Sequence, residues 1–412
     1  MMGNQAGINL LQAAYFVFVA RLLGVSGYGT FSALVALIAL VSPFGSLGAL
    51  NLMIRRIAID ASVARREFTT AVMVTVIGGI VLGTLILCLA PTVAPHSSTL
   101  YELGLIAAGD LLGVRLTLVA GGVFQARERM ARTAILPVLV YALRLLFILG
   151  AVALNIGVTV RSWAVMYASA ALIVGLGSVI YTARLVGMER PRPSEIRREW
   201  RDGLLFALGF SAQSVYNDID KAMLGRLSTA AATGVYATAY RIVDMAFTPM
   251  RALLAAAYAR FFVAGESGLA SSVRLAKRMI RPATAYCVFA SIALFSCAGL
   301  APVIFGPSYS SSVGAIRGLA LLPILKEFHY LAADSLSGAR MQGVRTIAQV
   351  CVAILNVGLN LILIPRYGWH AAVVTSLISD GTLAIFLWAL VGLYLHREAS
   401  HSSYPRHRAV RA

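Results

Sequence analysis

Charged side chains inside long apolar runs are the residues of this sequence that could do chemistry. The basic ones are Arg115, Arg144, Arg241 and Lys326, and the acidic ones are Asp110, Asp244, Glu327 and Asp380. Asp218, Asp220, Lys221 and Arg317 lie nearer the ends of such runs. An ionisable group at mid-membrane costs at least about 2.5–3.5 kcal/mol, so such groups face a protein interior or a water-filled cavity. These residues therefore indicate either a polar path or a set of interhelical ion pairs.

Arg115 and Arg144 are candidates for contact with an anionic group. A guanidinium binds phosphate or pyrophosphate through parallel hydrogen bonds, which suits it to that role better than an ammonium group. In the first half of the chain these two arginines face only Asp110. Two interpretations stay open: a polar path for an anionic headgroup, or a pair such as Arg144 with Asp110 that only holds helices together.

The buried carboxylates are candidates for ion coupling. A carboxylate removed from water binds a proton or a cation more readily, so Asp110, Glu327 and Asp380, together with Asp220, are possible proton or sodium relay groups. Arg241 and Asp244 are three residues apart on one helix and share a face, which favours a local ion pair between them.

Familiar enzymatic and nucleotide-binding motifs do not occur in the sequence. There is no GxxxxGK[ST] phosphate loop, no GxGxxG after a strand and no HExxH. The four cysteines lack CxxC spacing and a histidine cluster, so we expect small buried hydrophobic residues. We therefore expect no cofactor, no metal site and no enzymatic activity. The net charge of +18 does not indicate nucleic acid, because the basic residues fall in loops between apolar runs.

These charged residues must be positioned by membrane-spanning helices. Of 412 residues, 59% are hydrophobic and 13% are charged, far from the balance of soluble proteins. Apolar runs long enough to cross a bilayer predict twelve helices. Their spans are 2–21, 30–52, 68–91, 102–124, 134–155, 163–184, 203–225, 230–253, 280–304, 312–337, 346–365 and 370–395. The first run has no basic start and no cleavage site, so we expect a retained helix that begins abruptly.

The distribution of Lys and Arg predicts the orientation. Twenty-four of these residues fall in one alternating set of loops and tails, whereas Arg21, Arg161, Arg226 and Arg366 are the four in the opposite set. Cytoplasmic loops carry the excess of positive charge, so both termini are predicted to be cytoplasmic.

A charged, proline-bearing segment divides the chain near its middle. We predict a six-helix lobe over 1–186, a basic cytoplasmic linker over 187–201, a second six-helix lobe over 202–395 and a basic tail over 396–412. An internal echo supports this division: GTFSA from Gly29, followed by Pro43, resembles GVYAT from Gly234, followed by Pro249. The pattern is typical of a duplicated six-plus-six transporter related by a pseudo-two-fold repeat.

Two segments resemble a known family of transporters. Ala20–Gly48 (ARLLGVSGYGTFSALVALIALVSPFGSLG) and Tyr216–Met245 (YNDIDKAMLGRLSTAAATGVYATAYRIVDM) are similar to the corresponding helices of Wzx-type polysaccharide flippases. These belong to the multidrug/oligosaccharidyl-lipid/polysaccharide exporter (MOP) superfamily, which is MATE-like. The resemblance implies an all-α membrane fold and a central cavity between two lobes. This chain departs from many relatives in its abrupt start and in lacking two further helices at its carboxyl end.

The resemblance also implies a function. Members of this family flip polyprenyl-pyrophosphate-linked oligosaccharide to the outer leaflet of the inner membrane for O-antigen, lipopolysaccharide or exopolysaccharide synthesis. They are expected to act beside a polysaccharide polymerase and a chain-length regulator. Central charged residues are implicated in the family, and the comparable positions here are Arg115, Arg144, Asp220, Lys221, Arg241 and Lys326. Alternatives are a drug or cation antiporter of the same superfamily, a lipid II flippase, or a membrane-embedded polysaccharide polymerase, which the very short outward loops disfavour.

Overall fold

The first half of the chain forms long apolar helices joined by short turns. The computed structural model describes residues 2–46, 48–190 and 217–402, and no strand occurs within these ranges. The helices of the first half are α1 (Met2–Gly45), α2 (Ala49–Ile59), η1 (Ala61–Val63), α3 (Ala64–Val93), α4 (Leu100–Ala108), η2 (Gly109–Val114), α5 (Arg115–Ala126), α6 (Met130–Ala153) and α7 (Val160–Val186).

The second half continues the same pattern. Residues 217–227 are helical. They are followed by α9 (Ala230–Ala246), α10 (Thr248–Gly265), α11 (Leu269–Cys297), η3 (Ala298–Leu300), α12 (Ala301–Phe305), η4 (Pro307–Tyr309), α13 (Ser312–Leu319), α14 (Leu322–Gly338), α15 (Gln342–Tyr367) and α16 (Trp369–Ser402). The predicted all-α membrane class is confirmed.

Eight helical stretches among the described residues are long and apolar enough to cross a membrane, and α9 with α10, bent by 49°, makes a ninth. The difference from the twelve predicted spans has local causes. The predicted helices 2–21 and 30–52 meet at a kink at Gly24, whose φ of 65° and ψ of 175° are not helical, so the two sides of the kink together make up α1 and the end of the second helix lies in α2. Most of 203–225 lies outside the described residues. The predicted helix 312–337 is divided into α13 and α14, and α14 carries Lys326, Glu327 and Asp334.

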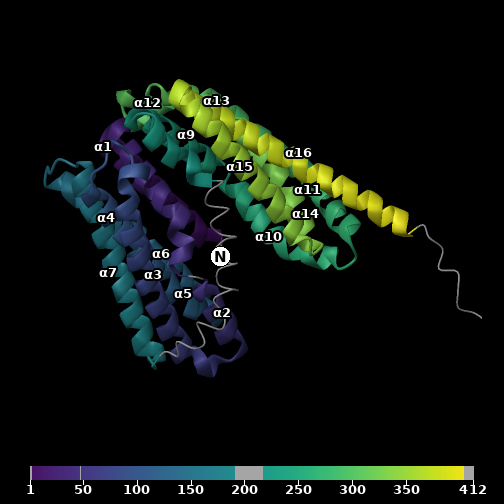
Figure 1. Ribbon diagram of the computed structural model, residues 1–412, viewed down its shortest axis with the longest axis horizontal. Helices are drawn as coiled ribbons and strands as arrows, with labels where there is room; N and C mark the ends of the chain where they lie inside the picture. The colour runs from purple at the N-terminus through teal and green to yellow at the C-terminus, as the bar shows by residue number, and fades with distance from the viewer. Residues whose placement is uncertain (1, 47, 191–216, 403–412) are drawn as a thin grey trace, which may run out of the picture. The chain divides into compact units, whose positions relative to one another are not determined.

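The described helices form two compact units, each with its own core. One comprises residues 1–238, 300–311 and 361–369, and the other 239–299, 312–360 and 370–412. In the first unit α3, α5, α6 and α7 pack as neighbours, and in the second α10, α11 and α14 do so (Figure 1). The predicted lobe boundaries stay a prediction, because most of the linker 187–201 lies outside the described ranges.

Glycines permit a close crossing of α1 and α9 in the first unit. A Cβ atom at Gly29 would lie 1.9 Å from the carbonyl oxygen of Ala230, and one at Gly234 would lie 1.9 Å from that of Val25. No side chain fits at either position. These are the two glycines that begin the internal sequence echo, so the echoed segments contact each other backbone to backbone.

The same two segments are each interrupted close to a proline. Pro43 lies in the last turn of α1, and the chain restarts as α2 after Gly48, whose φ of 70° is in the left-handed region that glycine tolerates. Pro249 lies in the first turn of α10, just after the bend that ends α9. Proline lacks a backbone N–H and clashes with the preceding turn, which explains why helix direction changes near both residues. Both echoed segments therefore have a break near the proline, after it in the first and before it in the second, and the half-repeat stays a prediction.

Candidate functional site

The candidate site in the first unit is built around a π-helical turn, η2, between α4 and α5. Glycines bring this turn against α7: a Cβ atom at Gly113 would lie 2.4 Å from the carbonyl carbon of Ala171, and one at Gly175 would lie 2.4 Å from the carbonyl oxygen of Gly113. The wider π-helical turn projects Asp110 toward α7, where the Tyr167 hydroxyl donates a 2.8 Å hydrogen bond to its carboxylate. Such turns are frequent at functional sites.

Arg144 of α6 reaches the same carboxylate. One of its terminal nitrogens, Nη2, lies 3.7 Å from Oδ1 of Asp110, and the guanidinium carbon lies 3.4 Å from the centre of the Tyr167 ring. The residue is 4% exposed. The pair that the sequence suggested is therefore present, at a distance longer than a hydrogen bond.

The hydrogen-bond donors of Arg144 are incompletely used. Its Nε and Nη2 atoms are buried and have no hydrogen-bond partner within the described part of the chain. A buried donor without a partner costs about 1–3 kcal/mol, and more when it belongs to a charged group. The guanidinium is thus a buried cation held in place by one carboxylate and one ring, with two donors that no described residue satisfies.

Aromatic side chains surround this arginine. Tyr15 of α1 packs against Tyr141 of α6 and Trp163 of α7, with ring centres 5.8 Å apart in both pairs. Phe31 of α1 packs against Trp163 and Tyr167. These rings supply rigid apolar walls with polar tips, which keep Arg144 out of lipid and fix its position.

Arg115, the first residue of α5, lies at the other side of η2. Its Nε donates a 2.7 Å hydrogen bond to the Ser42 hydroxyl of α1, one residue before Pro43. The structure thus places Arg115 near the break between α1 and α2, and Arg144 beside Asp110 of the π-helical turn.

In the second unit, Lys326 of α14 is the central buried cation. Its Nζ donates a 2.9 Å hydrogen bond to the Tyr240 hydroxyl and lies 3.9 Å from the Asp244 carboxylate. Lys326 is 4% exposed. The predicted pair of Arg241 with Asp244 is wrong: Asp244 instead pairs with Arg251 of α10 and approaches Lys326. The bend after α9 brings Arg251 within reach, and Arg241 lies half-buried on α9.

Glu327, next to Lys326, is fully buried beside α11. Its Oε1 accepts a 2.9 Å hydrogen bond from Thr284, while its Oε2 has no hydrogen-bond partner in the described ranges. No ion pair involving Glu327 occurs among the described residues. Of the four predicted ion-coupling residues, Glu327 is the one for which the described part of the chain supplies neither a basic partner nor a tyrosine.

Asp380 and Asp220 have close partners. Asp380 of α16 lies 2.9 Å from Nε2 of His329 of α14, and both are buried. In the first unit, Asp220 accepts a 2.8 Å hydrogen bond from Tyr236, and the neighbouring Lys221 pairs with Asp218 at 2.6 Å. Through these contacts Asp380 holds His329 in place, and Asp220 holds Tyr236 in place.

Several polar residues were missed by the sequence reasoning. Tyr167 and His329 lie in apolar helices, where an aromatic residue cannot be told from packing by pattern alone. Asp334 of α14 lies 3.9 Å from Arg345 of α15, and the Ser337 hydroxyl accepts a hydrogen bond from the same arginine. The position of Asp334 near a helix end was the one feature of the sequence that could have indicated this contact. No group of three His, Cys, Asp or Glu residues suited to a metal ion occurs in the part of the chain that was searched.

Comparison with protein families shows which family the sequence matches. A family model described as polysaccharide biosynthesis protein matches residues 2–259. The comparison with curated protein sequences gave no match.

Comparison with solved structures shows the fold. The chain is similar to a multidrug resistance MATE family transporter of the MOP superfamily in an inward-facing conformation, with a TM-score of 0.76 and 17% identity over 97% of this chain and 96% of that one. It is also similar to the lipid II flippase MurJ, with a TM-score of 0.68 and 10% identity over 94% of this chain and 86% of that one. A MOP superfamily transporter from Pyrococcus furiosus has a TM-score of 0.64 and 17% identity, over 96% of this chain and 93% of that one.

Proposed function

Because the chain belongs to the family of polysaccharide biosynthesis proteins, we propose that it is a transporter that flips lipid-linked oligosaccharide across the membrane. The substrate is polyprenyl-pyrophosphate-linked oligosaccharide, moved by alternating access from the inner to the outer leaflet of the cell's inner membrane for O-antigen or exopolysaccharide synthesis. The sugar head cannot cross hydrocarbon unaided, while the polyprenyl tail stays in lipid. The MATE-like fold and the similarity to MurJ support this proposal.

Arg144 is the observation that carries the proposal. A structural ion pair would consume the donors of the arginine, because a buried charge with unused donors is costly. Here two of them, Nε and Nη2, have no hydrogen-bond partner in the described part of the chain, while the guanidinium is held against Tyr167 and Asp110. A pyrophosphate oxygen would satisfy such a fork through charge-assisted hydrogen bonds.

The remaining basic candidates extend this interpretation. We propose that the substrate path has further contacts at Arg115, Lys221, Arg241 and Lys326. Glu327 is proposed as the first residue to test for ion coupling, ahead of Asp110, Asp220 and Asp380, because one carboxyl oxygen lacks a hydrogen-bond partner among the described residues. A proton or a cation bound there would satisfy it.

A drug or cation antiporter is the second candidate, favoured by the likeness to a multidrug resistance MATE transporter. Such a protein needs a site dominated by carboxylates and aromatic faces. The Arg144 site has aromatic walls and a single carboxylate, Asp110, in contact with the arginine. A cation would be repelled by the guanidinium, so the anionic substrate fits this site better.

Export of surface polysaccharide in a strain that depends on this gene tests the proposal. We expect Arg144→Ala to reduce export roughly tenfold to a hundredfold, since a hydrogen bond to a charged group contributes about 1.5–3 kcal/mol. Arg132→Ala, an exposed arginine on the same helix, is the matched control and should export normally. Protein levels are compared by immunoblot.

A double variant separates transport from helix pairing. Asp110→Asn with Arg144→Gln removes both charges and leaves neither partner as an unpaired buried ion. If Arg144 contacts substrate, this variant accumulates normally and still fails to export. Normal export by the double variant would show that the pair only holds helices together, and the proposed path would lose Arg144.

The proposal also predicts an orientation and partners. Both termini are predicted to lie in the cytoplasm. The protein is predicted to associate with a polysaccharide polymerase and a chain-length regulator, which would receive the flipped oligosaccharide. It predicts transport without chemical change of the substrate, hence no enzymatic step.

A further inference from the structure

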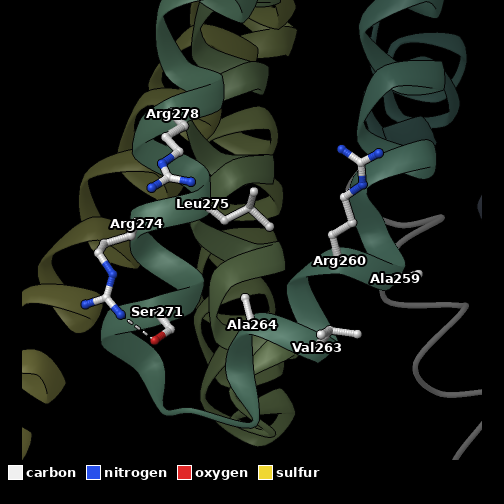
Figure 2. Close-up of a pocket in the computed structure, with 8 residues that line it drawn as sticks. All are labelled: Ala259, Arg260, Val263, Ala264, Ser271, Arg274, Leu275 and Arg278. Carbon is white, nitrogen blue, oxygen red and sulfur yellow. Dashed lines mark hydrogen bonds between the residues drawn. The ribbon is translucent and has the colours of Figure 1, made fainter.

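A pocket on the second unit lies between α10 and α11, apart from the buried charges described above. Its volume is about 420 Å³, and it is lined by Ala259, Arg260, Val263, Ala264, Ser271, Arg274, Leu275 and Arg278. Figure 2 shows Arg274 and Arg278 on one face of α11, with Arg260 coming from the other helix. Residues four apart on a helix are neighbours on its surface, so two guanidinium groups necessarily share this side of the pocket.

The arginines of this pocket lack acidic partners. None of Arg260, Arg274 and Arg278 takes part in an ion pair within the described ranges, and the contact found for Arg274 is a 2.6 Å hydrogen bond to the Ser271 hydroxyl. The nearby carboxylates do not line the pocket: Glu266 lies in the turn after α10, and Glu398 accepts a hydrogen bond from the backbone of Leu269. Three like charges around one hollow repel one another, and a bound anion relieves that repulsion.

Apart from Ser271, the rest of the lining is apolar. Val263 and Leu275 form its larger hydrophobic side chains, and Val263 is 70% exposed. Farther along α11, Phe289, Ile292 and Phe295 are also exposed on a helix that passes the criteria for a membrane span. A cationic pocket on a helix that also carries exposed apolar side chains suits a molecule with a charged head and a hydrocarbon tail.

We propose that this pocket binds the phosphorylated headgroup of a lipid in the cytoplasmic leaflet. The arginines belong to the loop set with excess positive charge, which the charge asymmetry predicts to be cytoplasmic. Basic pockets at that surface attract anionic headgroups. The headgroup can come from a phospholipid or from a polyprenyl pyrophosphate, which share the phosphate chemistry. The inference does not require the transport function proposed above.

Lipid binding to the purified full-length protein tests this pocket. The probes are short-chain phosphatidylglycerol, phosphatidylcholine as the zwitterionic comparison, and a short-chain polyprenyl pyrophosphate. We expect Arg274→Gln with Arg278→Gln to weaken binding of the anionic probes about 30-fold, at roughly 1 kcal/mol per arginine. Arg260→Gln, on the opposite helix, should weaken it about fivefold. Arg127→Gln with Arg129→Gln removes the same charge from another basic loop and should have little effect.

The outcomes separate the two lipid sources. Equal, pocket-dependent binding of both anionic probes indicates a general site for anionic lipid. Binding of the pyrophosphate probe alone indicates a site for lipid-linked substrate. The proposal is overturned if wild-type protein does not prefer anionic over zwitterionic lipid, or if the control pair loses as much affinity as the pocket pair. Loss of polysaccharide export in Arg144 variants with intact lipid binding would leave this inference unaffected.

Discussion

Arg144 combines features that are hard to explain by helix packing alone. An arginine that only joins two helices is most stable when its donors are all bonded, because water is absent to satisfy the remainder. Here the ring of Tyr167 and the carboxylate of Asp110 fix the guanidinium while Nε and Nη2 have no hydrogen-bond partner among the described residues. The arrangement resembles a preorganised anion site, whose donors are set before the ligand arrives.

Tyr167 offers a test of this preorganisation. Tyr167→Phe keeps the ring under Arg144 and removes the hydroxyl that donates to Asp110. We expect the free energy of unfolding to fall by about 1–3 kcal/mol, since a buried carboxylate loses a donor. Thermal melting in detergent measures it, with Tyr181→Phe on the same helix as the control. An unchanged melting temperature would show that the Asp110–Tyr167 contact does not fix the site.

Glu327 and Asp380 should respond differently to neutralisation. In Glu327→Gln the amide oxygen still accepts from Thr284, so the free energy of unfolding should change by less than about 1 kcal/mol while ion-dependent transport is lost. Asp380→Asn breaks the buried contact with His329 and should lower stability by about 1–3 kcal/mol. Thermal melting and transport at varied pH and sodium concentration measure both. Ion-dependent transport that survives Glu327→Gln would exclude it as a coupling residue.

For individual residues, the sequence was a better guide to which charged side chains are buried than to which residues they contact. The partner of Arg144 was among the expected ones, because Asp110 was the deep acid of that half. The partner of Asp244 was not, because the bend between α9 and α10 reorients the following turn, and Pro249 alone does not show which residues such a bend brings together. The roles of Tyr167 and His329 as partners of buried charges could not be predicted from residue spacing, because apolar helices also contain aromatic residues that only pack.

At the scale of elements, small residues decide which helices approach each other. Gly113 and Gly175 permit close backbone contact between η2 and α7, and Gly29 and Gly234 permit it between α1 and α9. Close backbone approach through small residues is a common basis for helix association in membranes, where lipid is as apolar as leucine. The positions of the helices were largely predictable from apolar runs. The breaks at Gly48 and Phe247 were not, although Pro43 and Pro249 lie near them, because a proline can also be accommodated as a kink inside a continuous helix.

Substitution of Gly234 tests the α1–α9 crossing. Gly234→Ala places a methyl group within 1.9 Å of a backbone oxygen that cannot move independently, so the cost should exceed the usual 1–3 kcal/mol of overpacking, at about 3 kcal/mol or more. Gly177→Ala in α7 is the matched control, since a Cβ atom there meets nothing within 4 Å. Folded yield by size-exclusion chromatography measures both variants. Equal yields would contradict the crossing.

For the whole molecule, the resemblance seen in the sequence is confirmed for family and fold. The family model covers residues 2–259 and so includes both segments on which the resemblance was based, and the similarity to MATE-like structures extends over nearly the whole chain. The length of the apolar runs was sufficient for the all-α membrane class, because the bilayer permits few alternatives to bundled helices. The family was indicated by the two resembling segments. The substrate was not predictable in the same way, since it depends on a few side chains whose partners are chosen by tertiary packing.

Orientation in the membrane is testable with single cysteines in a variant lacking the native four. Ile156→Cys lies in the exposed turn between α6 and α7, and Ser267→Cys in the exposed turn between α10 and α11. The charge asymmetry predicts that a membrane-impermeant maleimide added to intact cells labels position 156, and labels position 267 only after permeabilisation. Labelling in the opposite order would reverse the topology and place the basic loops outside.

Transport in a reconstituted membrane tests the central claim most directly. The wild-type protein is placed in liposomes containing a short-chain polyprenyl-pyrophosphate oligosaccharide, and the fraction of sugar accessible to an impermeant lectin is followed with time. We predict that accessibility rises faster than in protein-free liposomes, and that Arg144→Ala abolishes the increase while Arg132→Ala retains it. Accessibility that does not exceed the protein-free rate, or that is unchanged in Arg144→Ala, would contradict lipid-linked oligosaccharide transport through the Arg144 site.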